Sequence, residues 1–256
     1  MHERELLMQL EQAQLPAIAV AVDFADGDII PAHSHTCPQL LYAVTGVMVI
    51  EADTGQWVVP PTRGVWLQAG VAHKIRMRGD VQMRSIFVAP NAQVDLPHAD
   101  CVIDVPPLLR ELILAATKIA LPYDLESRDG RVMRLLLDEL RSLPVLPFHL
   151  PWPSDLRILR VCQTLAAHPH DATTATEWSA RLAMSLKTFR RQFQRSTGIT
   201  FGRWRQQARL LKALEALAEG QSVLAVALQH GYQSQSAFAA AFKQQFGVSP
   251  SAFYRD

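Results

Sequence analysis

Residues 185–198 read Ser185-Leu-Lys-Thr-Phe-Arg-Arg-Gln-Phe-Gln-Arg-Ser-Thr-Gly198. The same order of Ser, Phe, Phe and Gly returns 49 residues later, in Ser234-Gln-Ser-Ala-Phe-Ala-Ala-Ala-Phe-Lys-Gln-Gln-Phe-Gly247. In each copy the serine can cap a helix, the aromatic residues recur at helical spacing, and the glycine can end the helix. The sequence therefore predicts a duplicated helical unit, which is shorter than a solenoid array would need.

A shorter predicted helix precedes each copy, so each unit is expected to be a helix-turn-helix. Thr174 and Glu177 fit a capping box that opens a helix over 175–183, followed by a turn into Ser185. In the second unit Ser222 is expected to cap a helix over 223–230, followed by a turn into Ser234. A longer helix over 201–218 joins the units. It can place the second helix of each unit, called the reading helix below, in adjacent turns of a DNA major groove, roughly 34 Å apart.

The two halves of the chain differ in charge. Residues 1–150 contain 12 Lys and Arg against 18 Asp and Glu, whereas residues 151–256 contain 13 against 6. Between Trp178 and Leu214 there are nine basic residues and no acidic one. This division indicates that the second half meets a polyanion while the first half has another task.

Five segments of the second half carry a family resemblance: Leu156-Arg-Ile-Leu-Arg160, Trp178-Ser-Ala-Arg-Leu-Ala-Met-Ser185, Phe189-Arg-Arg-Gln-Phe193, Gly231-Tyr-Gln-Ser-Gln-Ser-Ala-Phe238 and Phe246-Gly-Val-Ser-Pro250. From Ser154 to Arg255 the chain resembles the AraC/XylS transcription regulators. The resemblance implies two helix-turn-helix units joined by a linker helix, which bind double-stranded DNA and act on RNA polymerase.

The same resemblance implies particular DNA contacts. Base-contacting positions of the family fall on Lys187, Thr188, Arg190 and Arg191 in the first unit, and on Gln235, Ser236, Ala237 and Ala240 in the second. The remaining predicted DNA contacts are Ser185, Arg195, Arg203, Arg205, Ser234 and Lys243. Residues 239–241 are alanines, where relatives often present a long polar chain. Because methyl groups can contact thymine but cannot hydrogen-bond, the second unit is expected to contribute less specificity and more positioning.

The first half has an all-β pattern, with predicted strands over 18–24, 40–44, 47–52, 56–59 and 82–88. Gly27, His33, His35, Gln39 and Gly46 follow the spacing of a cupin motif. This half resembles a cupin, an antiparallel β-barrel that is fused to AraC-type modules as a sensor. Gln39 stands where metal-binding cupins carry Glu.

Two interpretations of the cupin motif remain open. His33 and His35 lie two apart on a strand and share a face, and His73 is expected on a neighbouring strand. Three imidazoles can hold a divalent transition metal. A neutral Gln39 removes a charge that would favour a dication, so the same cavity can instead hold a small-molecule effector. The candidate effector residues are His33, His35, Gln39, Trp66 and His73.

The expected fold is multi-domain α+β. A cupin-like antiparallel β-barrel is expected over 1–100, a helical dimerisation segment over 101–143, a Pro-rich linker over 144–153, and an all-α double helix-turn-helix over 154–256. Four prolines between Leu143 and Pro153 exclude a helix there and favour an extended connector. Leu109, Leu112 and Leu136 are the candidate contacts of a homodimer.

Composition narrows the function. With 49% hydrophobic residues the chain is not a disordered one, and no apolar run approaches the roughly 18 residues of a membrane helix. The mixed charge of residues 1–5 and the three separated cysteines predict a cytoplasmic protein with neither secretory signal nor disulfide framework. We therefore predict a ligand-responsive DNA-binding regulator that is not an enzyme. The alternatives are a cupin-type metal-dependent enzyme with a helical appendage, and a constitutive regulator whose barrel only dimerises.

Overall fold

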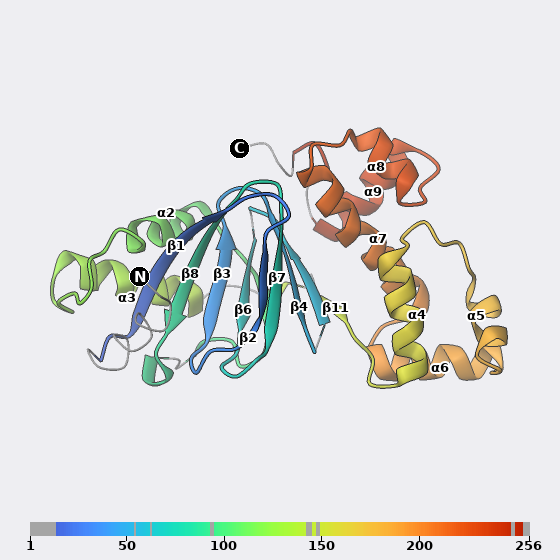
Figure 1. Cartoon of the computed structure of the whole chain (residues 1–256), viewed down its shortest axis with the longest axis horizontal. Helices are drawn as coiled ribbons and strands as arrows, with labels where there is room; N and C mark the ends of the chain where they lie inside the picture. The colour runs from blue at the N-terminus through green and yellow to red at the C-terminus, as the bar shows by residue number, and fades with distance from the viewer. Residues whose placement is uncertain are drawn as a thin grey trace. The chain divides into compact units, whose positions relative to one another are not determined.

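A computed structural model describes residues 14–53, 55–61, 63–92, 95–141, 145–146, 149–246 and 249–252 of the chain. The chain divides into two compact units: the N-terminal unit, Met1–Ala52 with Val59–Phe148, and the C-terminal unit, Asp53–Val58 with His149–Asp256. Figure 1 shows most of the strands in the N-terminal unit and a series of helices in the C-terminal unit. Within the described residues, no helix combines the length and the apolar character that crossing a membrane requires.

The larger sheet of the N-terminal unit is antiparallel, with the strand order β1-β8-β3-β6-β9-β10. Its strands are β1 (Ala17–Phe24), β3 (Gln39–Ala43), β6 (Arg63–Leu67), β8 (Val81–Val88), β9 (Cys101–Asp104) and β10 (Val145–Leu146). All five residues of β3 are buried, as expected for a central strand that is covered on both faces. A short 3-10 helix, Pro90–Ala92, follows β8.

Three strands of the second sheet belong to the N-terminal unit: β4 (Val47–Ala52), β7 (His73–Arg78) and β2 (Ile29–His33), in the order β4-β7-β2. Along β7 buried residues alternate with more exposed ones, so one face of this sheet points into the core. His33 on β2 is the register partner of His73 on β7. The predicted antiparallel β architecture is therefore confirmed, and the closure of these sheets into a cupin barrel stays a prediction.

Two helices cover the larger sheet, α2 (Pro107–Ala116) and α3 (Arg128–Arg141), which lie beside β1 and β8 in Figure 1. The prediction that Leu109, Leu112 and Leu136 contact a second copy is wrong, because these side chains are only 0%, 8% and 0% exposed. They pack into the core of their own unit with residues of the sheet. The apolar spacing is thus the signature of helices that cover a sheet.

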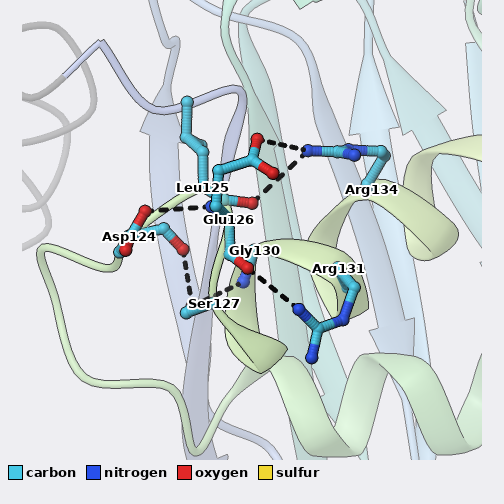
Figure 2. A network of polar contacts seen from close by, with 7 residues as sticks. All are labelled: Asp124, Leu125, Glu126, Ser127, Gly130, Arg131 and Arg134. Atoms are coloured by element: carbon cyan, nitrogen blue, oxygen red, sulfur yellow. Dashed lines mark hydrogen bonds and ion pairs between the residues drawn. The ribbon is translucent and has the colours of Figure 1, made fainter.

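The turn that enters α3 is closed by local hydrogen bonds (Figure 2). The Asp124 carboxylate accepts the amide N–H of Glu126 at 2.9 Å, and the amide of Gly130 donates to the Ser127 hydroxyl at 3.2 Å. A side chain at Gly130 would overlap the backbone carbonyl of Leu125. Only glycine therefore allows the chain to close this tightly onto the first turn of the helix.

The described part of the C-terminal unit contains a short strand pair and a series of helices. β5 (Gly55–Val59) pairs antiparallel with β11 (His149–Pro151). The helices are α4 (Leu156–Ala167), α5 (Ala175–Arg181), α6 (Leu186–Thr197), α7 (Phe201–Ala218), α8 (Val223–Gln229) and α9 (Gln235–Phe246). The predicted linker, 144–153, holds β10 and β11 and lies partly outside the described residues. The helices expected from the sequence repeat are confirmed.

Candidate nucleic-acid interface and histidine cluster

Helix α6 carries the first predicted reading surface. The hydroxyl of Ser185 accepts the amide N–H of Thr188 at 3.1 Å and so caps the helix. Gly198, with φ of 77°, ends it in the left-handed conformation. Phe189 and Phe193 are fully buried at 0% exposure, so the opposite face is turned to solvent. Its exposed residues are Lys187, Arg190, Arg191, Gln194 and Arg195.

Helix α5 and the following turn hold α6 in place. Thr174 and Glu177 form the predicted capping box: the Glu177 amide donates to the Thr174 hydroxyl at 3.2 Å, and the Thr174 amide donates to the Glu177 carboxylate at 2.6 Å. Trp178 is buried, with the guanidinium of Arg181 4.9 Å from its ring centre. Ala183 turns the chain with a φ of 51°, a conformation that L-residues rarely adopt.

Helix α9 carries the second predicted reading surface. The Ser234 hydroxyl accepts the amide of Ala237 at 3.1 Å, as its counterpart does in the first unit. Phe238 and Phe242 are fully buried. The predicted contacts Gln235, Ser236, Ala237, Ala240 and Lys243 are all exposed. Lys243 is the only cation within α9, whereas the exposed face of α6 carries four.

Two of the predicted DNA contacts, Arg203 and Arg205, lie on α7 and differ in their surroundings. Arg203 is exposed. Arg205 is half-buried, its Nη1 donates to the carbonyl of Thr173 at 3.1 Å, and its guanidinium lies 5.3 Å from the ring centre of Phe201. The structure therefore directs Arg205 toward a loop of its own unit, while Arg203 is accessible to a ligand.

The three histidines predicted to share a site lie together, but the prediction that His33 and His35 share a strand is wrong, because β2 ends at His33. The ring centres of His33, His35 and His73 are 4.4 to 5.4 Å apart, and each ring offers a nitrogen that lies within 4.8 Å of the others. Nδ1 of His33 lies 2.8 Å from the carbonyl of Pro31, and Nδ1 of His73 lies 2.9 Å from that of Val71. Because a carbonyl can only accept, both Nδ1 atoms carry the proton, and the Nε2 lone pairs are available to a ligand.

The neutral form is favoured in two of these rings, His35 and His73, because the pKa of each is lowered. Burial, reinforced by the neighbouring His33 and His73, lowers the pKa of His35 to about 4. Burial also lowers the pKa of His73, against the hydrogen bond that its ring donates to the Val71 carbonyl and the nearby Asp100 carboxylate, which both raise it. Among the described residues, the buried Nε2 of His73 has no hydrogen-bond partner. A neutral imidazole with an uncommitted lone pair is what a metal ion or a hydrogen-bond donor needs.

Of the other candidate effector residues, Gln39 lies beside the cluster and Trp66 does not. Gln39 is the register partner of Phe87, whose ring centre is 5.1 Å from that of His35. Its Nε2 donates to the Ser85 hydroxyl at 3.2 Å, and its buried Oε1 has no partner among the described residues. Trp66 is paired with Leu40, which follows Gln39 on β3, so Trp66 lies on the opposite face of the sheet.

Comparisons with known proteins identify the family of the chain. The helix-turn-helix domain family matches residues 178–256. The HTH-type transcriptional regulator NimR of Escherichia coli is 32% identical over 223 residues, which span 87% of this chain and 81% of the relative. The chain belongs to the AraC/XylS family. The HTH-type transcriptional activator RhaS of Escherichia fergusonii is 32% identical over 145 residues, 56% of this chain and 51% of the relative.

Among solved structures, the DNA-binding domain of AdpA in complex with a target DNA is 31% identical to this AraC/XylS protein. The alignment covers 38% of this chain and 89% of that domain, with a TM-score of 0.37. Membership of the family, which the sequence relatives establish, makes the chain a DNA-binding transcriptional regulator.

Sequence reasoning missed one prominent feature of this AraC/XylS module. Arg209 on α7 donates from Nε to the carbonyl of Pro169 at 2.8 Å and from Nη2 to that of Asp171 at 3.2 Å. The sequence indicates only that Arg209 is a polar residue on a helix. Its acceptors are backbone atoms about 40 residues away, and backbone acceptors leave no mark on residue identity.

Proposed function

We propose that this AraC/XylS protein is a cytoplasmic regulator that reads DNA mainly through α6 and acts on RNA polymerase. The observation that carries the proposal is the exposed face of α6, where Lys187, Arg190 and Arg191 stand opposite a fully buried aromatic stripe. An arginine on such a face can bind guanine with two hydrogen bonds. Thr188 adds a further base contact, and Ser185, Arg195, Arg203, Ser234 and the exposed residues of α9, Lys243 among them, position the module on the duplex.

The test is a selection of duplexes from a random library by the purified full chain. Selected duplexes are expected to bind about 10³-fold or more tightly than random ones at physiological salt. Both affinities should fall as salt rises, because Lys and Arg contacts to phosphate release counterions. Equal affinity for selected and random duplexes would overturn sequence-specific reading.

We further propose that the histidine cluster and Gln39 form the effector site of the N-terminal unit. The support is chemical: the Nε2 atoms of His33 and His73 and the Oε1 of Gln39 are all acceptors of a hydrogen bond or donors of a lone pair. Such a set fits a divalent transition metal or a small molecule rich in N–H and O–H groups. An anionic effector would meet no positive charge on the two rings whose pKa is lowered.

Metal analysis distinguishes the two effector classes. Untagged protein is analysed for transition metals before and after chelation, and the chelated protein is titrated with Zn²⁺ or Co²⁺. If a metal is the effector, His35→Ala abolishes binding, while His98→Ala, at an exposed histidine outside the cluster, does not. If the effector is organic, neither protein binds metal and His35→Ala removes the transcriptional response. A normal response from a variant with all three histidines replaced by alanine would contradict both effector classes and leave the N-terminal unit as a dimerisation scaffold.

We also propose that the regulator works as a homodimer through the outer face of α2 and α3. Leu108 and Leu135 on these helices are 50% and 43% exposed, so each offers an apolar contact to a second copy. Pairing on DNA doubles the number of contacts that one module makes. Light scattering on the full chain should give a dimer for the wild type and a shift toward monomer for Leu108→Glu with Leu135→Glu. A wild type that is monomeric at tens of micromolar overturns the proposal.

A further inference from the structure

Helix α7 takes part in both helix-turn-helix units. Its first turns place Phe201 and Trp204 in the aromatic cluster of the first unit, with ring centres 5.4 and 6.1 Å from that of Phe193. Its later turns pack against α8 and α9 of the second unit. The direction of this helix relative to each unit therefore determines how far apart the two reading helices lie.

Two arginines one turn apart on α7 hold the loop that leads into the first unit. Arg205 binds the carbonyl of Thr173, and Arg209 binds the carbonyls of Pro169 and Asp171. The loop ends at Thr174, the cap of α5. Arg209 thereby ties the entrance of the first unit to the middle of α7.

The guanidinium of Arg209 also lies against the second unit. A Cβ atom built on Gly231 would be 3.2 Å from its Cζ, so the guanidinium packs closely on the turn between α8 and α9. The next residue, Tyr232, makes an edge-to-face contact with Phe238 of α9, with ring centres 5.2 Å apart. One side chain thus contacts the loop before α5 on one side and the support of α9 on the other.

The charge of Arg209 is directed inward. Burial, with the positive charge of Arg205 beside it, lowers the pKa of Arg209. A guanidinium stays charged in proteins, so a half-buried one needs acceptors from the protein, and the two carbonyls supply them. A lysine could not replace this geometry, because its single ammonium group lacks the planar fork that reaches both carbonyls.

We propose that Arg209 is a positioning residue that fixes the spacing between the two reading helices, and so sets the distance between the two DNA elements that the protein accepts. The proposal rests on the proposed function, namely that α6 and α9 read one duplex together. It predicts that loss of the guanidinium fork leaves each unit able to bind while the preferred spacing is relaxed.

The test uses the full chain and one duplex selected by the wild type from a random library. Three forms are compared: the intact duplex, one with the element of the second unit randomised, and one with an extra base pair between the elements. The extra base pair moves the second element by about 3.4 Å and turns it by about 34°. The wild type is expected to bind the lengthened duplex about tenfold more weakly than the intact one.

Arg209→Lys and Arg209→Ala are expected to bind the intact duplex more weakly and to lose most of the discrimination against the lengthened one, to less than about threefold. Their affinity for the duplex with only the first element should stay within about twofold of the wild type. Gln206→Ala, at an exposed neighbour on α7, should behave as the wild type throughout. Circular dichroism verifies that each variant is folded. If Arg209→Ala is unfolded, the discrimination measured with Arg209→Lys tests the proposal.

Each remaining outcome overturns one specific statement. If Arg209→Lys binds and discriminates as the wild type does, charge alone is sufficient and positioning by the fork is wrong. If the variants weaken binding to the first element as much as to the intact duplex, Arg209 acts on the fold or on phosphate and the inference is also wrong. If the wild type selects no duplex at all, the failure belongs to the proposed function.

Discussion

The two reading helices, α6 and α9, are alike on their buried side and different on their exposed side. Both begin at a serine whose hydroxyl accepts a backbone N–H, and both bury two phenylalanines four residues apart. On the exposed side, the positions equivalent to Arg190 and Arg191 are Ala239 and Ala240. The duplication therefore repeats the fold of the unit, whereas the charged side chains at these two positions belong to α6.

The turns of the two units also differ, by one residue. Thr174 and Ser222, the caps of α5 and α8, are 48 residues apart, whereas Ser185 and Ser234, which begin α6 and α9, are 49 apart. The extra residue lies between Gly231 and Ser234. Tyr232, which follows Gly231, contacts Phe238, whereas the residue that follows Ala183 in the first unit is Met184. The second unit thus supports its reading helix differently.

The largest expected effect tests the likeness of the buried sides. Phe193→Ala and Phe242→Ala each remove a fully buried ring, so each should lower the free energy of unfolding by about 3–5 kcal/mol. Urea unfolding followed by circular dichroism measures both. A loss below about 1 kcal/mol in one of them would show that this unit does not depend on its aromatic stripe. Phe193→Leu and Phe242→Leu serve as milder controls.

The next effect tests the difference between the exposed sides. Arg191→Ala should cost about 1–3 kcal/mol on the selected duplex and relax its sequence preference, because the lost contact is to a base. Ala240→Ser at the equivalent position in α9 should change binding by less than about 0.5 kcal/mol. Fluorescence anisotropy with selected and random duplexes measures both.

Arg203→Ala is the control for a phosphate contact. It should weaken binding to selected and random duplexes alike and reduce the salt slope by about one unit. If Arg191→Ala and Arg203→Ala act alike on both kinds of duplex, the assignment of base and phosphate contacts is wrong.

The difference between local and long-range interactions explains what the sequence could reveal. The capping box at Thr174 and the cap at Ser185 were predictable, because their partners lie three residues away. β7 was absent from the strands predicted by the apolar pattern because it alternates charged residues with apolar ones, and β2 was absent because Pro31 interrupts its apolar residues. The resemblance to a cupin still predicted that His73 lies on a strand beside His33, whereas the side of the sheet on which Trp66 lies depended on the register of β6 with β3.

A smaller effect tests the second unit under acid. His230 is 5% exposed, and its counterpart in the first unit is Leu182. Its Nδ1 donates to the carbonyl of Val226 at 2.8 Å. Burial lowers the pKa of His230, helped by the charge of Lys212 and opposed by the bond to Val226 and by the Glu215 carboxylate.

Since the folded pKa lies below the unfolded value, the unfolded chain binds more protons in acid. The stability from neutral His230 is therefore complete above about pH 6.5 and is lost as the pH falls through the lowered pKa. His230→Leu should lose less of its melting temperature between about pH 7.5 and pH 5 than the wild type does. His35 and His73, whose pKa is also lowered, are present in both proteins. An equal loss in both would contradict a contribution from His230.

The smallest effect tests the turns themselves. Ala183 has a φ of 51° where the second unit has Gly231 with a φ of 78°. The left-handed conformation costs an L-residue about 1–2 kcal/mol, while glycine costs about 0.5–1 kcal/mol in lost freedom of the unfolded chain. Ala183→Gly should therefore stabilise the protein by about 0.5–1 kcal/mol in urea unfolding. Gly231→Ala should destabilise it, because its Cβ would also press on the guanidinium of Arg209. If Ala183→Gly destabilises instead, the turn of the first unit has a packing role for the Ala183 methyl group that the turn of the second unit lacks.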